Sequence, residues 1–193
     1  PSSPVLKGAC DCTYTPTDYS PNDCVIFGDY LYVIGNESGG SGILVVDISN
    51  PSAPSVDKFV QYPLSVQGYY MNNELLYIYT TVDGGLYSYS AYQDDFSDYL
   101  AIDGLFDAFI DVEKNYVYIS NGKDNPTGPV SIVDCSSISN LQLVSEYDPG
   151  VKSSYIVARE EYLFITTYSW GGHIVDISDK TAPELIFKIE DVP

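Results

Sequence analysis

Three aspartates recur at nearly fixed spacing, and carboxylates of this kind could serve acid–base catalysis or bind a metal. They are Asp47, Asp134 and Asp176, and Ser90 holds the corresponding place in a fourth copy. Each Asp ends an apolar run and precedes a polar turn, where its side chain can accept hydrogen bonds from backbone N–H groups. A catalytic residue has no need to recur in every copy, so the pattern favours turn capping.

The single histidine, His173, is another candidate for acid–base chemistry, but no nucleophile-elbow pattern or Ser-His-Asp arrangement accompanies it. We therefore expect no catalytic residue. Trp170 lies three residues earlier in a glycine-rich stretch, and aromatic faces stack on sugars or apolar partners. We expect a binding face on the glycine-rich loops that carries Asp83, Asp124, Trp170 and His173; packing of Trp170 between repeats is the alternative.

Acidic clusters offer oxygen ligands of the kind that calcium prefers. Neither cluster has the alternating acids, central glycine and closing Glu of the twelve-residue calcium loop. We therefore expect solvated surface and no cofactor, with calcium as the alternative. The first cluster is Asp94, Asp95 and Asp98, and the second is Asp103, Asp107 and Asp111.

Three of the four cysteines lie close together, at Cys10, Cys12 and Cys24. The segment lacks the Cys-x-x-Cys pairing and the histidine of a zinc site. We expect a disulfide from Cys10 or Cys12 to Cys24, with a stabilising effect of about 2–4 kcal/mol and an oxidising, extracellular setting; reduced thiols or a metal site are the alternatives. Cys135 replaces the isoleucine of other copies and is expected to be buried.

The net charge of −19 arises from 27 acidic residues against only 8 lysines and arginines. Such a surface repels phosphate backbones and anionic membranes, which disfavours nucleic-acid and membrane partners. No apolar run approaches the roughly 18 residues of a membrane span. Asn36-Glu37-Ser38 is an N-glycosylation sequon on an expected exposed loop, so Asn36 is a candidate for glycosylation.

The repeated Asp or Ser positions are separated by 43, 44 and 42 residues. A period in the low forties with several strands per period predicts a β-propeller. Each repeat contains alternating apolar runs, tight polar turns and an aromatic strand, which predicts an all-β fold of four blades, or a four-blade segment of a larger propeller, with four antiparallel strands per blade. The predicted blades are 25–61, 62–102, 103–148 and 149–193, and one position of the aromatic strand is held by Tyr32, Tyr77, Tyr118 and Phe164.

The sequence closely resembles the LVIVD-repeat family, which is named for its Leu-Val-Ile-Val-Asp core. The resemblance rests on Ile-Leu-Val-Val-Asp-Ile-Ser-Asn at 43–50, on His-Ile-Val-Asp-Ile-Ser-Asp at 173–179 and on the Pro turn at 50–54. The second copy departs from the pattern, because Ser90 replaces the Asp. The resemblance implies a propeller on a secreted or cell-surface protein and leaves the molecular function open.

Residues 1–7 match 51–57, so the chain opens in the middle of a repeat and residues 1–24 form an orphan outer strand with a cysteine-containing loop. Pro4, Val5 and Leu6 could add as a strand to the sheet edge of a neighbouring subunit, and repetition of that contact would build a filament. A cut from a longer propeller is the alternative.

These observations together predict a non-enzymatic extracellular structural or adhesive module. Its expected partners are itself, another surface protein or glycans. One alternative is a carbohydrate-active propeller enzyme that uses two acidic loop residues. The other is a ligand-binding domain of a larger surface receptor.

Overall fold

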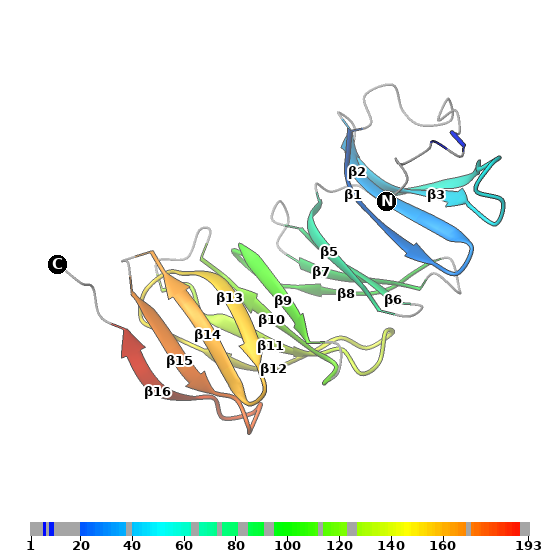
Figure 1. Ribbon diagram of the computed structural model, residues 1–193. Helices are drawn as coiled ribbons and strands as arrows, with labels where there is room; N and C mark the ends of the chain where they lie inside the picture. Colours follow the sequence, from blue (N-terminus) through cyan, green and yellow to red (C-terminus); the bar gives the residue numbers. More distant parts are fainter. Residues whose placement is uncertain are drawn as a thin grey trace, which may run out of the picture. The chain divides into compact units, whose positions relative to one another are not determined.

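The computed structural model describes residues 6, 8–9, 20–37, 40–62, 66–72, 75–80, 85–90, 95–111, 114–122, 127–168 and 171–189. These residues form four antiparallel sheets of four strands, each with its strands in chain order (Figure 1). None of the described residues forms a helix with the length and hydropathy that a membrane span requires.

The sheets follow one another along the sequence. The first contains β1 (Ser20–Phe27), β2 (Tyr30–Glu37), β3 (Gly40–Asp47) and β4 (Ser55–Tyr62). The second contains β5 (Val66–Asn72), β6 (Leu75–Thr80), β7 (Gly85–Ser90) and β8 (Asp95–Ala101). The third contains β9 (Asp107–Asp111), β10 (Tyr116–Ser120), β11 (Val130–Asp134) and β12 (Gln142–Tyr147), and the fourth contains β13 (Ser153–Arg159), β14 (Tyr162–Thr167), β15 (Gly172–Asp176) and β16 (Glu184–Ile189).

The repeat period read from the sequence coincides with the structural repeat. The third strand of each sheet ends at Asp47, Ser90, Asp134 or Asp176, which are the positions aligned in the four copies. The predicted all-β fold with four antiparallel strands per blade is confirmed.

In three of the four sheets, an aspartate side chain closes the turn that follows the third strand. In the first, third and fourth sheets, an Oδ1 atom accepts a hydrogen bond from the backbone N–H two residues later: Asp47 from Ser49 at 2.8 Å, Asp134 from Ser136 at 2.7 Å and Asp176 from Ser178 at 2.8 Å. The predicted capping role of these three aspartates is therefore confirmed.

The chain divides into two compact units, Pro1–Val66 and Gln67–Pro193. In the second unit, side chains from β7, β9, β10 and β11 share one buried cluster, which includes Cys135 as expected. A second cluster joins the sheet β9–β12 to the sheet β13–β16. The sheets of this unit therefore stack face to face, as the green, yellow and orange strands show (Figure 1).

Two parts of the first unit differ from the sequence-based expectation. β1 begins at Ser20, ahead of the expected blade start at residue 25. Asn36 lies in β2, opposite Ser20 and Ser41, because the β2–β3 hairpin continues through residues that were expected to form a loop. The glycine-rich sequence predicted a loop here, but β2 and β3 remain paired as far as Glu37 and Gly40.

Candidate interaction surface

The fourth sheet has two apolar faces of different composition. Side chains alternate along β13 and β14, because successive residues of a strand point to opposite sides. One side consists of buried Ile156, Ala158, Leu163, Ile165 and Val175, together with Ile177 just after β15. We call this set the aliphatic face of β13–β16.

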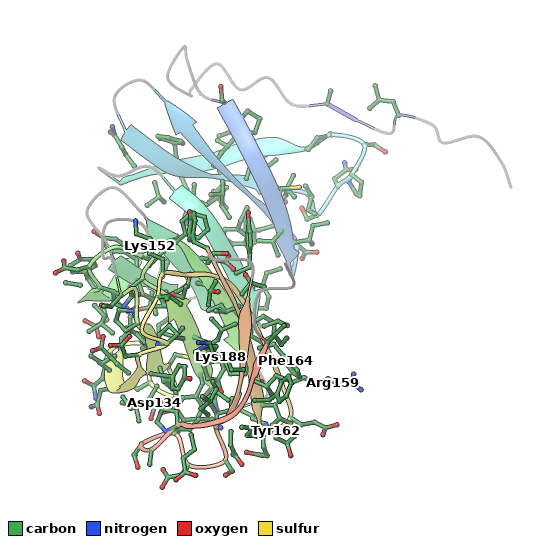
Figure 2. The ribbon with its side chains drawn as sticks, turned by 90° about the vertical axis from the view of Figure 1, so that its left-hand side faces the viewer. Asp134, Lys152, Arg159, Tyr162, Phe164 and Lys188 are labelled. Carbon is green, nitrogen blue, oxygen red and sulfur yellow. The ribbon has the colours of Figure 1, made fainter. Side chains whose placement is uncertain are left out.

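The opposite side of the same sheet carries larger and more aromatic side chains. Val157, Phe164, Ile174 and Phe187 pair in one row across the four strands. The aromatic face is defined as Val157, Arg159, Tyr162, Phe164, Ile174, Phe187 and Ile189. Its aromatic members are exposed, Phe164 to 38% and Phe187 to 57%. Arg159, Tyr162 and Phe164 lie next to one another in Figure 2.

The aliphatic face is covered by the third sheet. Tyr118, Val130 and Ile132 pack against it, with partly buried Phe109, Tyr116 and Tyr147 around them. Burial of each large apolar side chain stabilises by about 1.5–3 kcal/mol. In this pair of sheets, the aromatic side of the third sheet therefore packs against the aliphatic face of the fourth.

The residues of the aromatic face hold the same strand positions in the fourth sheet as the residues of the third sheet that pack against the aliphatic face. Tyr118 pairs with Phe109 and Ile132, and Phe164 pairs in the same way with Val157 and Ile174. Tyr118 is fully buried, however, whereas Phe164 is 38% exposed. The aromatic face is thus a stacking surface of the same construction without a described partner.

Charged side chains clamp the rim of the stacked pair. The Nζ atom of Lys114, next to β10, donates a hydrogen bond to the backbone O of Glu160 and lies 3.3 Å from a carboxylate oxygen of Glu161. Lys180 lies 3.9 Å from the other Glu161 oxygen and 5.5 Å from the ring centre of Tyr116. Glu161 of the β13–β14 turn therefore lies between Lys114 of the neighbouring sheet and Lys180 of its own sheet.

The inner edge of the same pair is held by two polar residues of the third sheet. Ser120 Oγ donates to the backbone O of Ser154 at 2.6 Å, and Asp107 Oδ2 accepts from the backbone N–H of Ile156 at 3.2 Å. Burial raises the pKa of Asp107, and this effect outweighs its backbone hydrogen bonds from Ile156 and Ala108, which lower it. Asp107 is therefore both a structural acceptor and a partly desolvated carboxyl group.

His173 lies in this interior rather than on an exposed loop. It belongs to β15 and is 5% exposed, with its Nδ1 atom 2.8 Å from the hydroxyl of Tyr147. Burial, and to a lesser degree the charge of Lys188, lower the pKa of His173, so the ring is neutral near pH 7. The expectation that His173 belongs to an exposed binding face is wrong, because the third sheet covers it.

The other members of the expected binding face, Asp83, Asp124 and Trp170, lie outside the described residues, and that face remains a prediction. Of the expected assembly strand, Pro4 and Val5 also lie outside them, whereas Leu6 is described, exposed and outside any strand. Cys10 and Cys12 lie outside the described part, and Cys24 is an exposed residue of β1. The disulfide therefore remains a prediction.

Of the three calcium candidates, one lies outside the described residues and two lie within them. Asp94 lies outside the described residues, and Asp95 begins β8. Both oxygens of Asp98 accept backbone hydrogen bonds, one from Tyr99 at 2.8 Å and one from Leu141 at 2.6 Å. Across the described ranges, no three His, Cys, Asp or Glu side chains gather in a way that could hold a metal ion. Asp98 thus ties β8 to the chain before β12.

Sequence reasoning missed the aromatic face. Its signal is visible in the sequence as alternating large apolar residues, Tyr162 and Phe164 in one strand and Phe187 and Ile189 in another. Alternation predicts that these residues share a side of the sheet, but it does not predict whether that side is covered.

Comparison with solved structures places this architecture among propeller-type proteins. A functionally unknown protein from Desulfotomaculum acetoxidans DSM 771 matches with a TM-score of 0.70 at 12% identity over 92% of this chain and 58% of that one. A "putative 6-phosphogluconolactonase" from Bacteroides uniformis ATCC 8492 matches with a TM-score of 0.66 at 15% identity, over 89% and 55%. The periplasmic gluconolactonase of Pseudomonas aeruginosa matches with a TM-score of 0.62 at 10% identity, over 87% and 56%. The chain thus spans a little over half the length of each.

The prediction that the chain is not an enzyme, which rested on the lack of a recognisable catalytic motif, is contradicted by the structural matches. Two of the matched structures are described as a 6-phosphogluconolactonase and a gluconolactonase. Since identities of 10–15% relate the fold alone, these matches assign no activity to this chain. They do show that proteins with this fold can be enzymes.

The sequence comparisons agree with this fold. The search of curated proteins found no match. The LVIVD repeat model matches residues 20–60 and 151–191, which contain the fourth sheet and all but the last two residues of the first. The chain thus carries two stretches that match the LVIVD repeat, in a fold of the β-propeller type.

Proposed function

We propose that this protein is an exported structural module that makes protein–protein contacts through the aromatic face of β13–β16. The observation that carries the proposal is the uncovered row Val157, Phe164 and Phe187 on a sheet whose neighbour buries the equivalent side chains. Monomeric proteins rarely leave a contiguous apolar patch of several hundred Å² in water, and larger patches mark interaction sites.

The composition of the face favours a protein partner over a glycan. Sugar recognition combines an aromatic platform with converging polar groups, whereas the central row of this face is apolar across all four strands. Charged residues lie at one end only, where Arg159 pairs with Tyr162 and the row continues to Asp176 and Glu184. An apolar centre with a charged rim is the usual anatomy of a protein interface.

Two observations support export. One matched propeller is a periplasmic gluconolactonase. The LVIVD repeats point to secreted or cell-surface proteins by resemblance. Nucleic acid is disfavoured as a partner by the charge of −19.

Hydroxyl-radical footprinting tests the contact. The radicals oxidise exposed aromatic side chains, so Tyr162 and Phe164 should react in the dilute purified chain and become protected in the extracellular material of the cells that produce it. Leu143, an exposed apolar residue of β12, is the internal control and should react in both samples. Equal oxidation of Tyr162 and Phe164 in both samples would show that no protein covers the face.

Hydrolysis of a sugar lactone is the second candidate function, because one matched structure is a gluconolactonase and another is described as a "putative 6-phosphogluconolactonase". Water attacks the ring carbonyl and the ring C–O bond breaks, which a general base accelerates. The candidate base is Asp107, which is half-buried on β9. Burial raises the pKa of Asp107, and a carboxylate with a raised pKa is a stronger base. The test measures the rate of gluconolactone ring opening with the purified chain and in buffer alone. A faster rate with the chain, which Asp107→Asn slows, would establish this activity. Equal rates with the chain and in buffer would exclude it.

A further inference from the structure

His173 bridges two stacked sheets of the compact unit Gln67–Pro193 by a hydrogen bond. Its Nδ1 atom lies 2.8 Å from the hydroxyl of Tyr147, and the two rings meet edge to face with their centres 5.9 Å apart. His173 belongs to β15 of the fourth sheet and Tyr147 to β12 of the third. Val175, two residues further along β15, lies on the aliphatic face, so His173 continues that face toward β12.

The neutral form of the His173 ring suits this position better than the charged form. Across the described residues, the buried Nε2 atom has no hydrogen-bond partner. A neutral ring has one N–H donor and one acceptor nitrogen, and the hydroxyl of Tyr147 can serve Nδ1 in either role. A protonated ring has two N–H donors and a positive charge, so Nε2–H would be a charged donor in the interior without an acceptor. Protonation therefore costs free energy as long as the ring stays between the sheets.

The groups around the ring add to this cost. Lys188 of β16 pairs directly with His173 and its positive charge opposes protonation, while Ile165, the partner in β14, is apolar. On the third sheet, Tyr147 stays neutral in acid, because burial raises its pKa. Asp148, the next residue, uses a carboxylate oxygen to accept the backbone N–H two residues later. Among the described residues that pair with or bond to the ring, none supplies a negative charge.

We propose that His173 is an acid-sensitive latch between the third and fourth sheets. At neutral pH the uncharged ring holds β15 against β12 through Tyr147. In mildly acidic solution a proton binds Nε2, the ring turns out toward water, and the stacking of β12 on β15 loosens next to Val175. The latch uses residues of one compact unit and needs no partner protein, so it is independent of the proposed binding function.

The direction of the effect follows from proton binding. Burial, and to a lesser degree Lys188, lower the pKa of His173 from its ordinary value of 6.5. The stability that the neutral ring contributes is therefore complete above pH 6.5 and is lost as the pH falls from there through the lower folded-state pKa. Because one proton is taken up, the opening equilibrium should rise by at most about tenfold per pH unit. Asp107 acts in the opposite direction, since its pKa is raised and its protonation favours the folded state.

Proton NMR on the full chain tests the latch, because His173 is the single histidine and its ring signals are unambiguous. The ring is titrated from about pH 8 to about pH 5, a range that lies above the ordinary pKa of carboxyl groups. Hydrogen exchange of the β12 and β15 amides, corrected for the intrinsic effect of pH, is followed over the same range. We expect the ring to titrate below pH 6.5 and the exchange to accelerate with the same midpoint. The β2 and β3 amides of the other compact unit are the internal control and should keep their protection.

The variant His173→Gln separates the latch from other effects of acid. Gln keeps an oxygen and an N–H₂ group for the hydroxyl of Tyr147 but does not titrate, so exchange of the β12 and β15 amides should not respond to pH. The same acceleration in this variant as in the parent would show that acid acts elsewhere and would overturn the proposal. A parent chain whose ring becomes protonated while these amides stay protected would overturn it as well.

The charge of Lys188 gives a test that leaves the latch itself intact. Lys188 is exposed, so the fold should tolerate Lys188→Gln, and the loss of its repulsion should raise the midpoint of the His173 titration. Lys114→Gln removes an equal charge near the β13–β14 turn, at the other end of the stack, and should leave the midpoint close to that of the parent. Equal midpoints in the parent and in Lys188→Gln would contradict the surroundings on which the latch depends.

Discussion

At the scale of single residues, one carboxylate oxygen caps the turn after the third strand in the first, third and fourth sheets. The hydrogen bonds from Ser49 lower the pKa of Asp47, and those from Ser178 lower the pKa of Asp176. A carboxyl group with a depressed pKa contributes stability in its charged form. That contribution is complete above the ordinary value of 3.8 and is lost as the pH falls through the lower folded-state pKa.

The variants Asp176→Asn and Asp176→Ala distinguish the contribution of the capping hydrogen bond to stability from that of the negative charge. Asn keeps an oxygen acceptor for the N–H of Ser178, so its melting temperature at neutral pH should stay close to that of the parent, whereas Ala loses the cap and should melt lower. Calorimetry on both variants, at neutral pH and below pH 3.8, is the measurement. A smaller acid-induced loss of stability in the Asn variant than in the parent is expected, and an equal loss would contradict the role of the charge.

The β13–β14 turn contains a left-handed residue that is not glycine. Glu160 has a φ of 54°, and the equivalent position of the β1–β2 turn is Gly28 with a φ of 58°. A side chain in this region costs about 1–2 kcal/mol, from which the greater flexibility of unfolded glycine subtracts. Glu160→Gly should therefore raise the free energy of unfolding by about 0.5–1 kcal/mol, measured in urea. Glu160→Ala retains the Cβ and is the control that should show no such gain.

At the scale of the element, neighbouring residues of β14 have opposite environments. Leu163 is fully buried against the third sheet, whereas Phe164 projects from the aromatic face. Leu163→Ala should lower the free energy of unfolding by about 2–5 kcal/mol, because it leaves a cavity in the stacked pair. Phe164→Ala should change it by about 1 kcal/mol or less in the dilute chain. Urea unfolding of the two variants compares them, and equal losses would show that the aromatic face is covered within one molecule.

At the scale of the whole molecule, the charge of −19 opposes association of two copies. Salt screens this repulsion over a Debye length of about 8 Å at physiological ionic strength, while apolar stacking is not weakened by it. Any association between copies should therefore strengthen as salt rises from about 0.02 M to 0.5 M, as measured by sedimentation velocity. Weaker association in high salt would show that attraction between charges, rather than apolar stacking, holds the copies together.

The sequence by itself determined the elements and their repeat. Strand alternation, turn residues and aspartate caps are local, so the positions of Asp47, Ser90, Asp134 and Asp176 were sufficient to place the third strand of each sheet. The aspartate role followed for the same reason, since the cap and its N–H donor are two residues apart.

Only the tertiary structure decided which side of each sheet is covered. Tyr118 and Phe164 hold the same place in their repeats, yet one is fully buried and the other is exposed. His173 likewise reads as a loop residue but lies behind Tyr147 of the third sheet. Burial depends on whether another sheet stacks on a face, and that contact joins residues far apart in the chain, which periodicity within a strand does not encode.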